Sequence, residues 1–173
     1  ASPLCLDTNT LGRASDGQKV VRVLGSANLY PALPAAFVSG RSLTLVGPGP
    51  AAQPPAVFAA PAATAFTVSG ATTRLTLDGI VAKTSQYAIS CTTGASITLR
   101  RSTLTENPGV ACTVNGCTLQ IERTLFSNNG RALYVVGSTA YNIRNSIFAN
   151  NGSSASDSAV IIDDGDGSFV YNT

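Results

Sequence analysis

The sequence contains no histidine, tryptophan or methionine, and only 12% of its 173 residues are charged. Histidine is the commonest general base near neutral pH and the commonest metal ligand. Without it, Ser-His-Asp and Cys-His catalytic sites are excluded, and most hydrolytic sites are disfavoured.

The sequence also lacks long runs, both of charge and of apolar residues. The 11 Lys and Arg exceed the 9 Asp and Glu by a net charge of only +2, and no basic arm is present, so we expect no nucleic-acid partner. No apolar segment reaches about 18 residues, so we expect no membrane span. The 44% of apolar residues are enough for a sizeable core in one domain spanning residues 1–173.

What the sequence does have is a repeat with a period of 22 over residues 65–152, without insertion or deletion. Two apolar columns show the register: Leu77, Leu99, Ile121 and Ile143 form one, and Leu75, Ile97, Leu119 and Tyr141 the other. A third column holds Ala82, Leu104, Phe126 and Phe148, and a fourth holds Ser85, Asn107, Asn129 and Asn151. Such columns predict one supersecondary unit stacked on itself.

Within each unit the apolar residues alternate with polar ones, which is the pattern of an extended strand. We expect short strands near residues 66–69, 75–78 and 80–83, with equivalents in each later unit. Stacked in parallel, these units bury one continuous core that includes the phenylalanines of the third column. We expect the asparagines of the fourth column to adopt left-handed backbone at a turn, with their amides hydrogen-bonded from coil to coil.

Two segments depart from the repeat. Residues 1–18 are rich in turn-forming residues and are predicted to cap one end of the stack, which otherwise exposes core and unpaired strand edge. Residues 48–61 contain five prolines, and the strand motif before them recurs with an offset of 32 instead of 22. We therefore expect ten extra residues in one Pro-rich loop, which either shields the first coils or forms a binding face.

The four cysteines favour an oxidising, extracellular or cell-surface location, with any secretion signal already removed. Cys112 and Cys117 flank the turn signal Asn115-Gly116, so a local disulfide between them is our preferred pairing among three connectivities. The alternative is that Cys91 and Cys112 fill core columns as small apolar residues.

Two segments fit a short generic repeat: Ile121-Glu-Arg-Thr-Leu-Phe-Ser-Asn-Asn-Gly130 and Ile143-Arg-Asn-Ser-Ile-Phe-Ala-Asn-Asn-Gly152. On these motifs, nearly the whole chain resembles the pectin-lyase-like superfamily. The resemblance implies an all-β fold, a right-handed parallel β-helix or solenoid of about six coils with 22-residue repeats. It implies little about function, because these repeats encode turns and core rather than chemistry.

Many relatives in that superfamily are polysaccharide lyases with an Arg base and acidic calcium ligands, or glycoside hydrolases with clustered Asp residues. Here Asp78 and Glu122 are two coils apart, roughly 9.6 Å, which suits an inverting glycosidase pair in distance. However, Arg100 between them favours the ionised form of both carboxylates, whereas a general acid must be protonated. A catalytic pair is therefore disfavoured, and we name no catalytic residue.

An outward strip of polar and charged residues is the candidate binding surface. Its members are Thr76, Asp78, Thr98, Arg100, Arg101, Gln120, Glu122, Arg123 and Arg144. A flat cationic strip of this kind suits an acidic polysaccharide. The alternative is a solvated salt-bridge ladder that fixes strand register, with each exposed pair contributing roughly 0.2 to 1 kcal/mol.

The only acidic cluster consists of Asp163, Asp164 and Asp166. Three carboxylates on a Gly-containing loop could hold Ca²⁺, although the spacing is not that of an EF-hand. Ordinary turn chemistry is the alternative explanation, and no other cofactor is expected.

The final coil is expected to be incomplete, because residues 168–173 align with residues 141–146 and the sequence then stops. Either the natural protein continues or a partner covers the open coil, and we expect self-association there. The favoured function is a non-catalytic extracellular or cell-surface module for binding or display, with a polysaccharide as the ligand considered. The alternative is a carbohydrate-active enzyme, either a polysaccharide lyase or a glycoside hydrolase, or a fragment of one.

Overall fold

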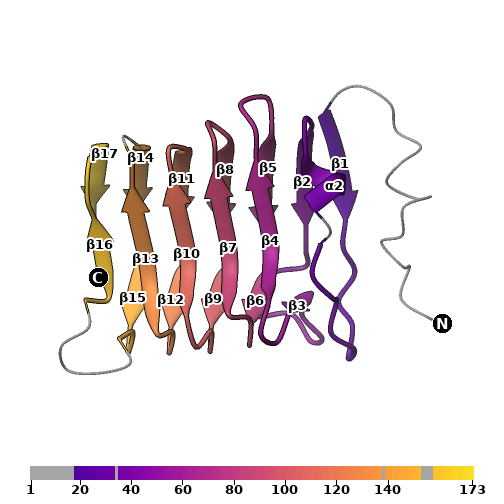
Figure 1. The fold of residues 1–173 in the computed structure, drawn as a ribbon. Helices are drawn as coiled ribbons and strands as arrows, with labels where there is room; N and C mark the ends of the chain where they lie inside the picture. Colours follow the sequence, from indigo (N-terminus) through magenta and orange to yellow (C-terminus); the bar gives the residue numbers. More distant parts are fainter. Residues whose placement is uncertain (1–17, 34, 138, 153–157) are drawn as a thin grey trace.

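The computed structural model describes residues 18–33, 35–137, 139–152 and 158–173, which wind through three parallel β-sheets as one solenoid (Figure 1). We call the seven-stranded sheet A; it consists of β1 (Gln18–Arg22), β2 (Ser42–Val46), β5 (Arg74–Asp78), β8 (Ser96–Arg100), β11 (Thr118–Glu122), β14 (Thr139–Arg144) and β17 (Gly165–Val170). Sheet B consists of β3 (Val57–Ala59), β6 (Val81–Lys83), β9 (Thr103–Thr105), β12 (Leu125–Ser127) and β15 (Ile147–Ala149). Sheet C consists of β4 (Thr64–Ser69), β7 (Tyr87–Thr92), β10 (Val110–Asn115), β13 (Arg131–Val136) and β16 (Val160–Ile162).

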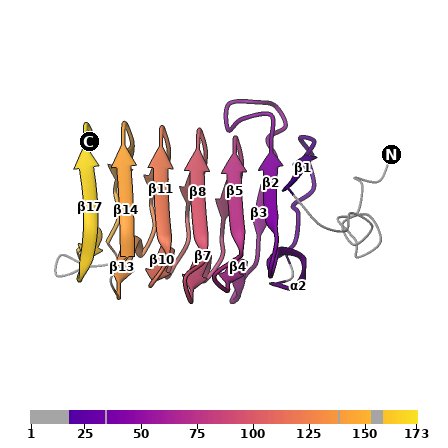
Figure 2. The same cartoon turned by 90° about the horizontal axis from the view of Figure 1, so that it is seen from above.

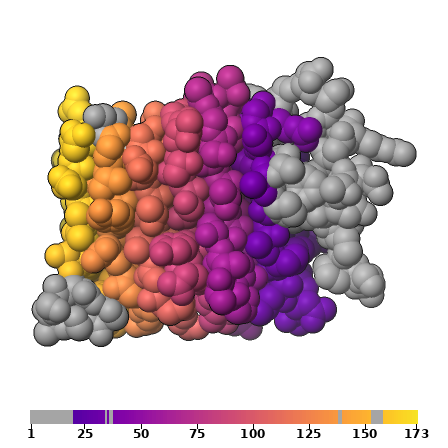
Figure 3. Space-filling view, in the orientation of Figure 1, coloured from indigo at the N-terminus to yellow at the C-terminus, as the bar shows by residue number. Residues whose placement is uncertain are grey.

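The predicted all-β solenoid of about six coils is confirmed. Each coil passes from sheet A to B to C, and the coils follow one another along the stack as successive layers (Figures 2 and 3). The register is that of the sequence columns, since Leu77 pairs with Leu99 and Ile121 with Ile143. The short helix α2 (Ala35–Val38), the only helix among the described residues, lies against β4.

The core lies inside the coil and follows the strand alternation. Along β5 the inward Leu75 and Leu77 are buried, whereas the outward Thr76 is only partly so. In sheet B the third column stacks its rings as predicted: the Phe126 and Phe148 centroids are 4.9 Å apart and nearly parallel. Because every coil presents the same inward positions, the apolar columns merge into one continuous core.

The asparagine column forms a hydrogen-bonded ladder, as predicted. Asn107 donates from both its backbone N and its Nδ2 to Oδ1 of Asn129, at 3.1 and 2.8 Å. Asn129 makes the same two bonds to Asn151. The expected left-handed backbone is wrong by one position, because positive φ falls on the preceding residues: Thr84, Glu106, Asn128 and Asn150. The ladder side chains can point inward because the residue before them makes the turn.

A second ladder, which the sequence analysis missed, lies at the turn between sheets A and B. Hydroxyl groups of its members accept backbone N–H groups one coil earlier, as Ser102 does from Ile80 and Ser146 from Thr124. Asn172 completes it by accepting from the Ser146 N–H at 2.9 Å. The signal was present, since Ser102, Thr124 and Ser146 also recur every 22 residues.

The Pro-rich insertion is shorter than predicted. Val46 pairs with Asp78, and Val57 pairs with Val81. The chain therefore uses residues 46 to 57 to pass from sheet A to sheet B, whereas the next coil makes the same passage in residues 78 to 81. Buried strand β3 therefore lies inside the segment 48–61 that was expected to be loop. The loop projects beyond the strand ends (Figure 2) and its Pro55 carbonyl accepts from Ser26 in the first coil. The predicted cap at residues 1–18 lies outside the described residues except for Gln18.

The predicted disulfide between Cys112 and Cys117 is wrong. The structure joins Cys91 to Cys117, with 6.3 Å between their Cα atoms, and leaves Cys112 as a buried free thiol. Cys91 belongs to β7 and pairs in register with Val114 of the next coil, so the bridge connects neighbouring coils instead of closing a local turn. The alternative is confirmed for Cys112, which fills a core position. Cys5 lies outside the described residues.

The predicted alignment of the last coil is also wrong, by one residue. Gly167 pairs with Tyr141 and Phe169 with Ile143, so the offset is 26 and not 27. The difference matters because a one-residue slip exchanges the two faces of a strand. Phe169 thus occupies the inward column, where its ring lies 5.4 Å from that of Phe148.

Candidate functional site

The outward face of sheet A carries the predicted strip. Strands β5, β8, β11 and β14 place Asp78, Arg100, Glu122 and Arg144 in one column, as predicted. A second column, Thr76, Thr98, Gln120 and Asn142, runs beside it in the same register. These side chains point outward because the inward positions of the same strands are taken by the core leucines and isoleucines.

A shallow groove of about 250 Å³ follows these columns across three strands. Its lining residues are Thr98, Leu99, Arg100, Gln120, Ile121, Glu122, Asn142 and Arg144. The side chains of Thr98, Gln120 and Asn142 make no intramolecular hydrogen bond in the part of the chain that the structure describes. Their hydroxyl and amide groups are therefore available to a ligand.

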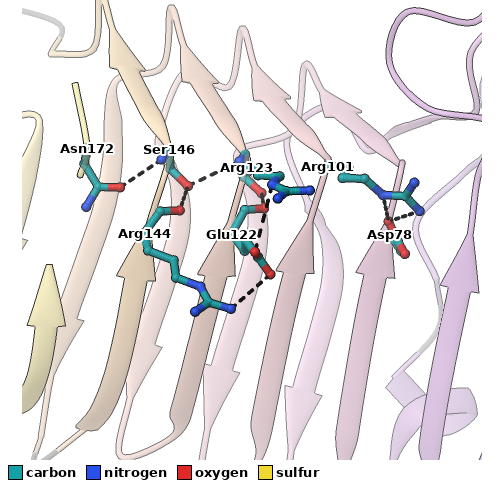
Figure 4. A network of polar contacts seen from close by, with 8 residues as sticks. Asp78, Arg101, Glu122, Arg123, Arg144, Ser146 and Asn172 are labelled. Atoms are coloured by element: carbon teal, nitrogen blue, oxygen red, sulfur yellow. Dashed lines mark hydrogen bonds and ion pairs between the residues drawn. The ribbon is translucent and has the colours of Figure 1, made fainter. Parts of the chain in front are cut away.

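The carboxylates of the strip are held by arginines (Figure 4). Asp78 accepts from Nε of Arg101 at 2.8 Å, and the Nη2 of Arg101 lies 2.8 Å from the same oxygen. This hydrogen bond, and then the charge of Asp78, raise the pKa of Arg101. Glu122 lies 3.4 Å from Arg144 and 4.0 Å from Arg123. Each carboxylate of the strip is thus paired with at least one arginine.

Arg100 is the exception in this column. The predicted ladder of alternating charges would pair it with both neighbours, but Asp78 bonds to Arg101 and Glu122 to Arg144. Its exposed guanidinium makes no ion pair or hydrogen bond among the described residues. A salt-bridge ladder thus accounts for part of the strip only, and Arg100 leaves an unpaired cation in the groove.

The next column makes the turn at the end of sheet A, and all four of its members have left-handed backbone. The φ angles are 69° at Gly79, 47° at Arg101, 50° at Arg123 and 52° at Asn145. Glycine and asparagine tolerate this conformation, whereas arginine pays roughly 1 to 2 kcal/mol for it. Arg101 and Arg123 therefore occupy positions whose left-handed backbone disfavours arginine.

The groove brings together only some of the predicted residues. Thr98, Arg100, Gln120, Glu122 and Arg144 line it, whereas Thr76, Asp78, Arg101 and Arg123 lie on the same face outside its lining. Asn142 lines the groove but was not among the predicted binding residues. Its place in the same column as Thr98 and Gln120 could have identified it. The strip carries four arginines and two carboxylates, a surplus equal to the net charge of the whole chain.

The acidic cluster lies around the turn between β16 and β17, where the chain passes from sheet C to sheet A. Asp163, Asp164 and Asp166 are exposed, and Asp164 has a φ of 59°, as expected for turn chemistry. Within the described ranges, no three His, Cys, Asp or Glu side chains converge to hold one metal ion. Calcium binding at this cluster stays a prediction.

This solenoid of parallel coils, with hydrogen-bonded ladders at its turns, is a parallel β-helix. Comparison with protein families agrees: residues 62–173 match the family described as the right-handed beta helix region. The chain belongs to this family, which confirms the resemblance at the level of the fold. Neither curated proteins nor solved structures yielded a match. Among the described residues, no helix is long and apolar enough to cross a membrane.

Proposed function

We propose that this β-helix is an extracellular or cell-surface module that binds an acidic polysaccharide along the outward face of sheet A. The observation that carries the proposal is the groove, in which the unpaired Arg100 lies beside three uncommitted polar side chains, Thr98, Gln120 and Asn142. A guanidinium offers planar donors that match a carboxylate, and amides and hydroxyls match sugar hydroxyl groups.

The geometry suits an extended ligand. Equivalent positions recur from coil to coil at about 4.8 Å, so a chain lying along the stack meets an uncharged polar side chain of the column Thr76, Thr98, Gln120 and Asn142 at each coil. The groove is lined by residues of three neighbouring strands, β8, β11 and β14. A repeating polymer fits such a surface better than a compact small molecule does.

A non-catalytic role is favoured over a carbohydrate-active enzyme. The two carboxylates on the face, Asp78 and Glu122, are each bonded to an arginine, at 2.8 and 3.4 Å. A lyase or hydrolase would instead need a free base or a protonated acid facing the sugar. Both carboxylates thus serve to order the arginines around the groove.

Binding is tested with polygalacturonate as the acidic probe and dextran as the neutral one, by calorimetry at several salt concentrations. We expect the chain to bind polygalacturonate, more weakly at high salt, and Arg100→Gln to weaken this about tenfold. Lys83→Gln is the matched control, because it removes the same charge from sheet B. Equal loss in both variants, or no binding by the wild type, contradicts the proposal.

A further variant separates binding from stability. Arg123→Asn introduces the residue that the next coil has at Asn145 and relieves the left-handed strain. We expect it to unfold at the same or a higher temperature than the wild type while it binds the acidic probe less tightly. Release of unsaturated products or new reducing ends from polygalacturonate, with or without Ca²⁺, would instead favour the enzymatic alternative.

A further inference from the structure

The two cations in the groove on sheet A are separated by two coils. Arg100 on β8 pairs in register with Glu122 on β11, and Glu122 pairs with Arg144 on β14. All three residues line the groove. Because neighbouring strands lie about 4.8 Å apart, the two arginines stand about 9.6 Å from each other, with one carboxylate between them. The order of charge along the groove is therefore positive, negative, positive.

Both arginines keep donors that a ligand can use. Arg100 makes no ion pair or hydrogen bond with any other residue that the structure describes. Arg144 contacts Glu122 through its Nη2 alone, at 3.4 Å, which leaves the other donors of its exposed guanidinium available (Figure 4). Each arginine can therefore bind one carboxylate, and the groove has two anion subsites.

The coil between the two subsites offers acceptors instead of a cation. Strand β11 places Gln120 and Glu122 in the groove, and Glu122 is the only charge that this strand contributes there. A carboxylate accepts hydrogen bonds from hydroxyl and amide groups but repels a second carboxylate. An extended pyranose chain advances by about one coil spacing per sugar, so three consecutive sugars span the groove. The middle sugar is the one that must be uncharged.

We propose that the ligand of this groove is a polysaccharide that alternates a uronic acid with an uncharged sugar. The inference rests on the proposed binding along sheet A and adds the spacing of the ligand's charges. The carboxylates of two uronic acids bind Arg100 and Arg144, and the uncharged sugar between them donates hydrogen bonds to Glu122. A polymer of uronic acids alone has a charged sugar at this middle position, where its carboxylate gains no cation of the groove.

Two short ligands of equal charge test the spacing. A tetrasaccharide of alternating glucuronic acid and N-acetylglucosamine has two carboxylates on every second sugar, whereas digalacturonic acid has two on adjacent sugars. We expect the tetrasaccharide to bind about fivefold tighter, because it alone gains a second exposed ion pair. The disaccharide of glucuronic acid and N-acetylglucosamine should bind as weakly as digalacturonic acid. Maltotetraose, which has four sugars and no charge, controls for ligand length.

Nuclear magnetic resonance titration of the labelled chain measures these affinities, and the amide spectrum shows whether each variant is folded. Arg100→Gln and Arg144→Gln should each lower the affinity for the tetrasaccharide about fivefold, to that of the disaccharide. Either change should lower the affinity for the disaccharide at most about twofold, because one of two equivalent subsites remains. Arg22→Gln is the matched control and should change neither affinity, since Arg22 is exposed in the same column of sheet A but lies outside the groove.

The possible failures are distinguishable. Equal affinities for the tetrasaccharide and digalacturonic acid would overturn the alternating spacing. Equal losses for the tetrasaccharide and the disaccharide in Arg100→Gln would show that the two arginines do not form two subsites. Binding of polygalacturonate without binding of the tetrasaccharide overturns this inference alone. No binding of polygalacturonate or of any oligosaccharide overturns the proposed function as well.

Discussion

At the scale of single residues, Cys112 is the group whose chemistry the fold changes most. Its side chain is fully buried in the core, and this burial raises the pKa of the thiol from 9.0 to about 12. A buried thiol that cannot ionise is inert toward electrophiles and toward the neighbouring disulfide. Cys112 is thus a small apolar core residue, with no role in the groove.

Cys112 predicts a loss of stability at alkaline pH. The unfolded thiol releases its proton above about pH 9 while the folded one keeps it, so the free energy of unfolding falls as the pH rises from about 9 to about 12. The free energy of unfolding falls by about 1.4 kcal/mol per pH unit over this range, and the full contribution of the buried thiol is present below about pH 9. Urea unfolding of the wild type and of Cys112→Ala across this range measures it. Parallel pH profiles for the two proteins would show that burial does not shift this pKa.

At the scale of elements, the asparagine ladder ties each coil to the next. In Asn129→Ala, the buried backbone N–H of Asn107 loses its acceptor, and the Nδ2 of Asn107 keeps only its bonds to the Thr105 and Ala82 carbonyls. An unsatisfied buried donor costs about 1 to 3 kcal/mol, so we expect the variant to lose roughly 2 kcal/mol of stability. Chemical denaturation measures this loss.

The neighbouring residues supply the comparisons for that experiment. Asn128 is exposed with a φ of 55°, so Asn128→Gly keeps the turn and is expected to be nearly neutral. Asn129→Ser should fall between the two, because Ser85 holds the first place in this column and its hydroxyl accepts from Ala60 at 3.0 Å. Equal losses for Asn128→Gly and Asn129→Ala would mean that the turn, and not the ladder, provides the stability.

The sequence predicted the strands well because their signal is periodic. Residues such as Leu77 and Ile121 repeat at a fixed interval and alternate in polarity, which together define the sheet, the register and the inward face. The turns carry no such alternation. Periodicity showed that Asn129 belongs to a column, but not whether Asn128 or Asn129 adopts the left-handed backbone.

The sequence predicted which residues of the candidate site lie in one column, but it did not predict which carboxylate pairs with which arginine. The register placed Arg100 between Asp78 and Glu122, as observed. Which carboxylate bonds to which arginine depends on the turn, where Arg101 reaches back to Asp78 across one coil. The sequence therefore identified the charged strip, whereas the unpaired state of Arg100 could be seen only in three dimensions.

At the scale of the whole molecule, the coils form a linear array in which each one contacts only its neighbours. Stability in such an array is a sum of coil and interface contributions, so a covalent link between two coils stabilises the interface that it spans. The disulfide between Cys91 and Cys117 is such a link, since it joins residues 26 apart in sequence and lies near the middle of the stack. A local bridge across a turn would not have had this effect.

Removing this link by the double change of Cys91→Ala and Cys117→Ala is expected to cost about 3 kcal/mol, as estimated from closure of a loop of this length. Hydrogen exchange should then show that β7, β10 and β11 lose protection before the other central strands, because the coils they belong to are no longer tied. Cys112→Ala is the control that leaves the bridge intact. Peptide mapping without reduction must recover residues 91 and 117 in one linked pair; a link from either cysteine to Cys112 would contradict both the pairing and the expected order of opening.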